Sequence, residues 1–289
     1  MDLSIIIVNY NTKELLKQTV ESVINTVGQA VTYEIIVSDN GSKDGSCEMI
    51  KESFPGIKLI ENNANLGFSK ANNIAIKESK GRYILILNSD TVVKENCLQK
   101  SVAYMDNHPE AGVLGCRVVL PDGSLDKACK RGFPTPKASL HYILKLDKLF
   151  PGNKNFGRYH MGHLSEFETG EVDAVVGAFM MVRREAIDKV GLLDESFFMY
   201  GEDIDWCHRI KEGGYRIIYY PKALTIHYKG ASSKKKRVKT IYEFHRAMYL
   251  FYNKHYRKKY NIFITLLVYI GIALKLILTY MVNIFKKKK

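Results

Sequence analysis

Cysteine is scarce in this sequence of 289 residues, and its arrangement excludes two classes of protein. The five cysteines are odd in number, widely spread and never spaced as Cys-x-x-Cys. Such a pattern argues against a disulfide framework and against a cysteine-based zinc site. We therefore predict reduced thiols in a cytosolic domain. The cysteines are Cys47, Cys97, Cys116, Cys129 and Cys207.

The first residues lack the features of a secretory signal. No basic residue precedes the apolar stretch at residues 3–8, and Asn9 and Asn11 interrupt it before it reaches signal-peptide length. We interpret this stretch as the first strand of a folded domain.

Acidic residues are almost absent from the last part of the chain. Residues 1–228 carry 27 Lys and Arg against 29 Asp and Glu, whereas residues 229–289 carry 16 against the single acid Glu243. A basic tail can bind nucleic acid or an anionic membrane. Residues 262–285 form an apolar segment long enough to cross a hydrocarbon core of ~30 Å. The tail therefore predicts a membrane partner and no nucleic acid.

The apolar segment is not uniform. Gly271, Lys275, Thr279 and Asn283 recur every four residues, which makes one narrow polar stripe on a helix. The stripe fits a helix in the membrane plane, a span packed against a partner, or a lone span. A soluble helix docked on the domain is a fourth reading, and the sequence leaves the topology open.

Strands alternate with helices through the first 120 residues. Apolar runs at residues 3–8, 33–38, 57–61, 83–90 and 112–120 predict strands, and helical periodicity recurs between them. This pattern predicts an α/β fold, Rossmann-like, with a mainly parallel central sheet flanked by helices. We expect one domain at residues 1–228, divided into one half at 1–120 and another at 121–228. Residues 229–289 form the tail.

Polar loops follow several predicted strands. Asp39 ends the second strand, and Asn88-Ser89-Asp90 ends the strand at residues 83–90. In open α/β sheets the carboxyl ends of the strands bind ligands, and two carboxylates there suit a nucleotide and a divalent cation. Each loop is alternatively a turn or a helix cap, because Asp, Asn, Ser and Gly favour both.

The second half contains two further signals. Residues 121–171 show little periodicity, which predicts a functional surface, a lid or an exposed insertion. The apolar run at 172–182 predicts a strand, and Gly177 in its middle suggests a bulge or the close approach of a ligand.

Three acids then open a predicted helix that ends near residue 212: Glu202, Asp203 and Asp205. Acids in a first helical turn complement the helix dipole, which is a structural explanation. Phe197, Phe198 and Trp206 surround them in sequence, however, and apolar neighbours raise the pKa of a carboxylate. One of the three is a candidate general base. A strand at 216–220 leads towards His227, a residue that is more often structural than a ligand.

These motifs occur together in the order typical of a known family. The sequence resembles family 2 glycosyltransferases with a GT-A fold, and its bacterial rhamnosyltransferase-like subgroup in particular, over residues 1 to about 230. The matching residues are Asn9, Tyr10, Asn11, Asp39, Asn40, Gly41, Ser42, Asp44, Gly45, Ser46, Asn65, Gly67, Phe68, Asn88, Ser89, Asp90, Gly201, Glu202, Asp203 and Asp205.

The resemblance implies a nucleoside-diphosphate sugar as donor, either a dTDP- or a UDP-sugar, with Mn²⁺ or Mg²⁺ as cofactor. It implies that Asp39 contacts the base or ribose, Asp90 and His227 bind the metal, and Asp203 is the general base. At the donor site it also places Asn9, Tyr10, Asn11, Asn40, Gly41, Asn65, Gly67, Phe68, Asn88 and Ser89. By the same resemblance, residues 1–120 are the nucleotide-sugar-binding half of the domain and residues 121–228 the acceptor-binding half. The metal motif departs from the usual pattern, because Asn88 stands where the family carries its first Asp.

The resulting hypothesis is an inverting glycosyltransferase at the cytoplasmic face of the cell membrane. Its acceptor is a hydroxyl of a lipid-linked saccharide in cell-surface polysaccharide synthesis, and a homo-oligomer is compatible with it. Two alternatives stay open: a sugar nucleotidyltransferase, which should show a basic Gly-rich loop near the first strand, and an inactive membrane scaffold. We also expect the basic cluster Lys234, Lys235, Lys236, Arg237 and Lys239 to turn the catalytic mouth towards the membrane.

Overall fold

The protein is described here by a computed structural model that covers residues 1–150, 152–229 and 237–287. Its strands are β1 Leu3–Asn9, β2 Tyr33–Asp39, β3 Lys58–Glu61, β4 Tyr83–Asn88, β5 Thr91–Val93, β6 Ala111–Val119, β7 Gly170–Val172, β8 Phe179–Arg183 and β9 Arg216–His227. Its α-helices are α1 Lys13–Thr26, α2 Ser46–Ser53, α3 Phe68–Lys77, α4 Cys97–Asn107, α5 Pro136–Ile143, α6 Leu146–Leu149, α7 Arg184–Val190, α8 Glu202–Glu212, α9 Arg237–His255 and α10 Ile262–Lys287.

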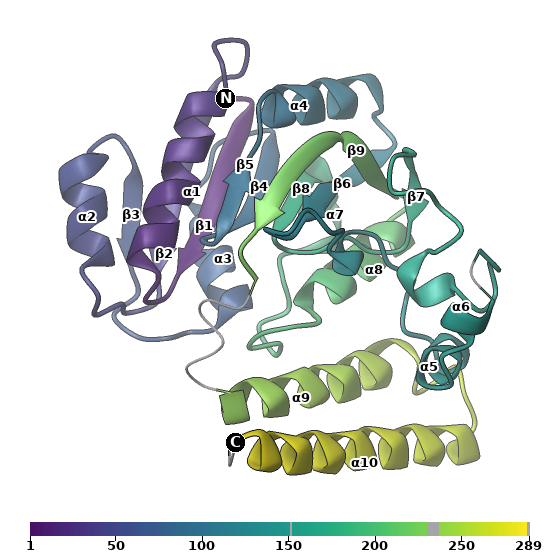
Figure 1. Ribbon diagram of the computed structural model, residues 1–289. Coiled ribbons are helices and arrows are strands. Elements are labelled where there is room, and N and C mark those ends of the chain that lie inside the picture. Colours follow the sequence, from purple (N-terminus) through teal and green to yellow (C-terminus); the bar gives the residue numbers. More distant parts are fainter. Residues whose placement is uncertain (151, 230–236, 288–289) are drawn as a thin grey trace.

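One sheet runs through both halves of the domain, in the strand order β3-β2-β1-β4-β8-β6-β9-β5 with β7 beside β9 (Figure 1). The strands β1 to β4 are parallel, as the alternating pattern predicts. In the second half β6 and β9 are also parallel, but β8 runs antiparallel to both β4 and β6, and β5 and β7 run antiparallel to β9. The sheet is therefore mixed.

The core lies in the middle of this sheet. The apolar residues of β1, β4 and β8 are almost completely buried, because these strands are covered on both faces. Helix α3 packs against β1 and β2, while α4 and α8 pack against β6 and β9. The two halves of the domain share this core.

Strand β9 is longer than the sequence predicts. The sequence predicts a strand at 216–220 only. Pro221 follows it, and proline removes a hydrogen-bond donor from a sheet. The structure accommodates Pro221 in a bulge: Cys116 pairs with Tyr220, but the next residue of β6, Arg117, pairs with Leu224. The strand therefore continues to His227.

The predicted strand at 172–182 is also corrected. Strand β7 ends at Val172 and β8 begins at Phe179, so Gly177 lies in the connection between them. Its backbone N–H lies 3.3 Å from the Asp203 carboxylate, and a Cβ added to it would touch the Phe68 ring at 3.4 Å. Gly177 is therefore close to protein groups, and the predicted close approach of a ligand stays a prediction.

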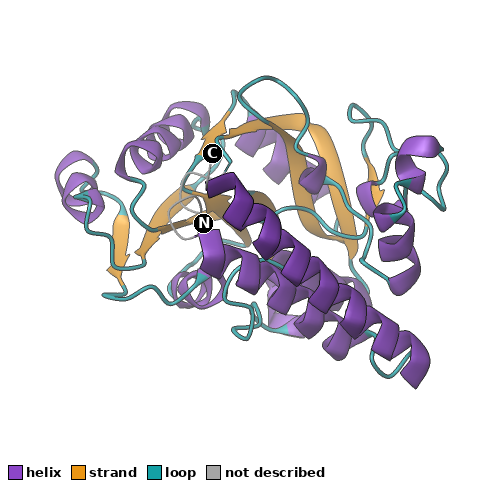
Figure 2. Cartoon of the chain, turned by 60° about the horizontal axis from the view of Figure 1, so that its bottom comes forward, coloured by secondary structure: helices purple, strands orange, loops and turns teal. Residues whose placement is uncertain are grey.

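Helices α9 and α10 lie side by side along one flank of the domain, with α10 outermost (Figures 1 and 2). Ala247, Phe251 and Tyr252 of α9, and Tyr256 directly after it, are buried in the domain core. Within the described residues, Ile262–Ile284 is the one helical segment long and apolar enough to cross a membrane, with a mean hydropathy of 2.4. The tail is therefore partly integrated into the domain.

Candidate active site

The ends of β1 and β2 form a polar network where the donor site was predicted. The two strands pair in register, which places Asn9 beside Asp39. One Asp39 oxygen accepts a hydrogen bond from Asn9 Nδ2 at 2.8 Å, and the other accepts one from Ser42 N at 2.7 Å. Asp39 is buried, so these bonds hold its carboxylate in a fixed orientation at the rim of the sheet.

A chain of hydroxyl groups joins this network to the end of β4. Thr12 Oγ1 donates to Asn9 Oδ1 at 2.6 Å and lies 2.9 Å from Ser89 Oγ. Ser42 Oγ accepts from Asn9 Nδ2 and from the Asn11 backbone N–H. Asn9, Asn11 and Ser89 are predicted site residues, and Ser42 belongs to the matching motif, but Thr12, whose hydroxyl group links Asn9 to Ser89, was missed.

The other predicted donor residues support the loops around this network. Asn11 has a φ of 54°, and its Oδ1 accepts from Lys43 N. Asn40 Nδ2 donates to Gly67 O at 3.0 Å, while Asn65 Oδ1 accepts from Gly67 N. The predicted residues Tyr10 and Gly41 lie in the same loops, and Gly41 has a φ of 75°. The donor residues predicted from three separate loops are therefore gathered at one edge of the sheet.

Asp90 and His227 meet at the same edge. Strand β5 pairs with the end of β9, so that Thr91 lies opposite His227, and His227 Nε2 is 3.2 Å from Asp90 Oδ1. The side-chain amide of Asn88 is 3.3 Å from Nε2. On its other side, His227 Nδ1 is 3.4 Å from Asp126 Oδ2, and Lys229 Nζ pairs with Asp126 at 3.0 Å. Sequence reasoning missed Asp126.

This donor set fits a divalent cation. A carboxylate oxygen and an imidazole nitrogen, both buried, converge on one point, and Mn²⁺ accepts this combination of ligands. Burial alone would lower the pKa of His227, but hydrogen bonds with Asp126 and Asp90 raise it to about 9. A cation held by Asp90 and His227 would therefore replace a proton on Nε2, and Asp126 would orient the ring through Nδ1.

Asp203 is held by a residue that the sequence did not reveal. Arg131 Nη2 donates to Asp203 Oδ2 at 2.6 Å and to Val175 O at 2.7 Å, and both side chains are buried. The backbone of Arg131 bridges to Ala174, which fixes the guanidinium in place. Arg131 comes from the stretch 121–171, which shows too little periodicity to predict its neighbours.

The neighbouring acids have different environments. Glu202 is buried, its Oε2 has no hydrogen-bond partner in the described part of the chain, and burial together with nearby Asp203 raises its pKa to about 8. Burial would raise the pKa of Asp205 as well, but hydrogen bonds from His255 and Lys254 lower it to about 2. Asp205 also pairs with Arg209 at 2.9 Å. Asp205 therefore ties α8 to α9, which argues against the catalytic role considered for it.

The connection between β7 and β8 links Asp203 to Asn88, two residues before the predicted metal ligand Asp90. The Gly177 N–H lies 3.3 Å from the Asp203 carboxylate, and the next residue, Ala178, accepts a hydrogen bond from Asn88 N. Helix α3 adds a second connection, because Phe68 N donates to Phe198 O and Ser69 Oγ donates to Phe197 O. The segment that carries the three acids is thus fastened to the donor half.

The mixed sheet flanked by helices is that of the GT-A fold, which the solved glycosyltransferases named below share. The sequence pattern described as "Glycosyl transferase family 2" matches residues 4–191, and the chain belongs to this family. It is a rhamnosyltransferase-like member. The resemblance inferred from the ordered motifs is therefore confirmed.

Two relatives indicate the subgroup. The N-acetylglucosaminyl-diphospho-decaprenol L-rhamnosyltransferase of Mycobacterium tuberculosis is 27% identical over 228 residues, which are 75% of this chain and 73% of the relative. Rhamnosyltransferase WbbL of Escherichia coli K12 is 30% identical over 233 residues, which are 78% of this chain and 82% of that protein.

Solved structures share the fold. A mannosyltransferase from Pyrobaculum calidifontis in complex with GDP-Man and Mn²⁺ has a TM-score of 0.59 at 16% identity, covering 86% of this chain and 63% of that one. GalNAc-T7 with UDP, GalNAc and Mn²⁺ has a TM-score of 0.58 at 20% identity, covering 78% of this chain and 44% of that one. This chain spans less than two thirds of either solved chain.

Proposed function

We propose that this glycosyltransferase transfers a sugar, rhamnose by its similarity to the named relatives, from a dTDP- or UDP-sugar to a hydroxyl of a lipid-linked saccharide. The reaction inverts the anomeric carbon and takes place at the cytoplasmic face of the cell membrane. The observation that carries this proposal is the link through Gly177 and Ala178, which keeps Asp203 close to the edge that carries Asp90 and His227.

The residues support a single displacement. Asp203 accepts the proton of the acceptor hydroxyl while that oxygen forms a bond to the anomeric carbon, and the bond to the diphosphate breaks. Arg131 positions the Asp203 carboxylate. Glu202 is less suited as a base, because with a pKa of about 8 it is mainly protonated at neutral pH. A bound cation would stabilise the negative charge on the leaving diphosphate.

Helix α9 supports the proposal that the active site is oriented towards a membrane. Lys239, near its start, lies 3.8 Å from the centre of the Phe198 ring, and Phe198 O is bonded to Phe68 N at the donor site. Arg246 donates to Ser196 O at 2.7 Å. Helix α9 therefore joins the loop that leads into α8, and so to Asp203, with α10. Residues 234–236 of the predicted basic cluster lie outside the described residues.

The proposed base is tested by Asp203→Asn, assayed with a panel of nucleotide sugars and a lipid-linked acceptor. We expect the release of nucleoside diphosphate to fall about 10²- to 10⁴-fold in kcat, with donor binding nearly unchanged. Asp205→Asn is the matched control. It should lower the melting temperature clearly and kcat only slightly. Near wild-type turnover by Asp203→Asn would exclude this base, and release of inorganic pyrophosphate would indicate nucleotidyl transfer.

Metal dependence follows from the donor set of Asp90 and His227. We expect excess EDTA to abolish transfer and added Mn²⁺ or Mg²⁺ to restore it, and Asp90→Asn to raise the metal concentration needed for half-maximal rate. Glu195→Gln, an acid outside this donor set, should leave the metal requirement unchanged. Full turnover in EDTA would show that the two side chains serve another purpose.

A further inference from the structure

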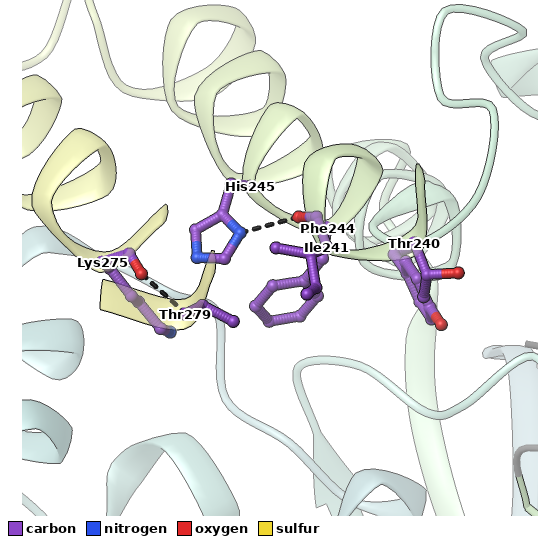
Figure 3. A pocket seen from close by; sticks show the side chains of 7 residues that line it. Thr240, Ile241, Phe244, His245, Lys275 and Thr279 are labelled. Carbon is purple, nitrogen blue, oxygen red and sulfur yellow. Dashed lines mark hydrogen bonds between the residues drawn. The ribbon is translucent and has the colours of Figure 1, made fainter. Parts of the chain in front are cut away.

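A pocket of about 350 Å³ lies between α9, α10 and the loop that leads into α8 (Figure 3). Tyr200 forms one wall, and it directly precedes Gly201, Glu202 and Asp203. The Tyr200 and Phe244 rings pack edge to face at 5.8 Å. The pocket therefore connects the tail helices to the segment that carries the proposed base. It is lined by Tyr200, Thr240, Ile241, Phe244, His245, Lys275 and Thr279.

Lys275 is the unusual member of this lining. It is the single charged residue of Ile262–Ile284, and its side chain is half-buried in the pocket. Its Nζ lies 5.3 Å from the centre of the Phe244 ring. No carboxylate within the described ranges lies within ion-pair distance of this Nζ. A cation withdrawn from water in this way normally has a partner of opposite charge.

His245 adds a second polar group to the pocket. Its Nδ1 donates to Ile241 O at 2.8 Å, and its Nε2 is buried without a hydrogen-bond partner among the residues described. Figure 3 shows the ring between α9 and the side chains of Lys275 and Thr279. An anion beside Lys275 would favour the protonated ring, whose Nε2–H could then donate a hydrogen bond.

The surroundings of the pocket suit an apolar chain. The outward face of α10 exposes large apolar residues, each between 47% and 75% accessible. They recur at helical spacing and so form one continuous stripe. The stripe consists of Phe263, Leu266, Leu267, Ile270, Leu274, Ile277, Leu278 and Met281.

We propose that this pocket binds the phosphate head group of a lipid, with Lys275 as its counter-ion, while the apolar stripe of α10 faces the hydrocarbon chains of the membrane. The inference rests on the membrane attachment in the proposed function, and it adds a defined site for the head group. Such a lipid would sit beside Tyr200 and so close to the acceptor side of the active site. A polyprenyl diphosphate and a membrane phospholipid share this chemistry.

Vesicle binding of the full-length protein tests the site. Neutral phosphatidylcholine vesicles are doped either with polyprenyl phosphate or with phosphatidylglycerol at equal charge, and binding is measured by co-sedimentation. We expect Lys275→Gln to weaken binding to phosphate-doped vesicles about tenfold, the effect of losing one charge-assisted contact. Lys275→Arg should retain most of it. Lys258→Gln, which removes an exposed charge from the turn between α9 and α10, should cost much less.

The two dopants distinguish the sources of the phosphate. A tenfold loss confined to polyprenyl phosphate assigns the site to the acceptor lipid, and an equal loss on both assigns it to phospholipid. Equal behaviour of Lys275→Gln and Lys258→Gln would overturn the proposal. A donor-induced thermal shift, measured on each variant, checks the fold and the donor site. If the wild-type protein shows no transfer activity at all, that result counts against the proposed function and not against the lipid site.

Discussion

Three acids within one turn of α8 behave differently because their neighbours differ. Asp205 is surrounded by Arg209, Lys254 and His255, whereas Asp203 faces the single guanidinium of Arg131. Glu202 is buried with one oxygen unpaired, and it has no ion-pair partner among the residues that the structure describes. The role of each acid is therefore determined by the side chains that contact it and not by its position in the helical turn.

Glu202 makes a specific prediction for the pH dependence of stability. Its pKa is raised in the folded protein, so the folded state retains a proton that the unfolded state releases above pH ~4.5. The free energy of unfolding therefore decreases as the pH rises from that value to about 8. Glu202→Gln should therefore stabilise the protein by less than about 1 kcal/mol at pH 5 and by about 1 to 3 kcal/mol at pH 7. Chemical denaturation of both proteins at several pH values measures this difference in the free energy of unfolding.

The control for this experiment is Glu185→Gln, which changes an exposed acid in the first turn of α7. We expect no pH-dependent gain from that substitution. If the stability difference between Glu202→Gln and wild type is constant from pH 5 to pH 9, the buried carboxyl is not protonated in the folded state.

At the scale of elements, α3 clamps the acid-bearing segment to the donor half. Besides the bonds of Phe68 and Ser69, Asn73 Nδ2 donates to Leu193 O at 2.8 Å and its Oδ1 accepts from Leu193 N. Gly67 precedes α3 with a φ of 86°, and a Cβ at this position would lie 2.6 Å from Phe198 O. The start of α3 therefore requires glycine for two reasons, backbone conformation and close approach.

Gly67→Ala should separate these two requirements when compared with Gly123→Ala. Gly123 has a similar φ of 82°, but a Cβ there meets no atom within 4 Å. We expect a loss of about 1 to 2 kcal/mol for Gly123→Ala from the backbone alone, and about 2 to 4 kcal/mol for Gly67→Ala. Gly67→Ala should also lower kcat, because it displaces Phe198. Equal losses of stability would mean that the contact with Phe198 adds nothing.

How many of these contacts the sequence predicts depends on how far apart the contacting residues lie along the chain. The loops after β1, β2 and β4 were found because each motif is local and parallel strands bring them to one edge. Asp126 and Arg131 were missed because their partners, His227 and Asp203, lie 101 and 72 positions away along the chain. The antiparallel β8 and the bulge at Pro221 were missed for the same reason, since they depend on pairing with strands distant in sequence.

For the whole molecule, the packing of the tail bears on its relation to a membrane. The polar stripe of α10 turns inwards: Lys275 and Thr279 line the pocket against α9, and Asn283 is buried. The apolar stripe turns outwards, and basic residues lie at both ends of the helix. A helix with one polar and one apolar face fits the plane of a bilayer better than a lone span.

This arrangement predicts that the tail attaches by its outer face. Leu267 and Leu274 are 68% and 55% exposed, so replacing both with Glu should move most of the protein from the membrane fraction to the soluble fraction without lowering the melting temperature. Ile24→Glu, an exposed apolar position on α1, is the control and should leave the protein on the membrane. Alkaline carbonate should extract the wild-type protein, because an in-plane helix has no segment across the bilayer. Resistance to carbonate, together with unchanged attachment of the Leu267→Glu and Leu274→Glu double variant, would mean that α10 leaves α9 and spans the membrane.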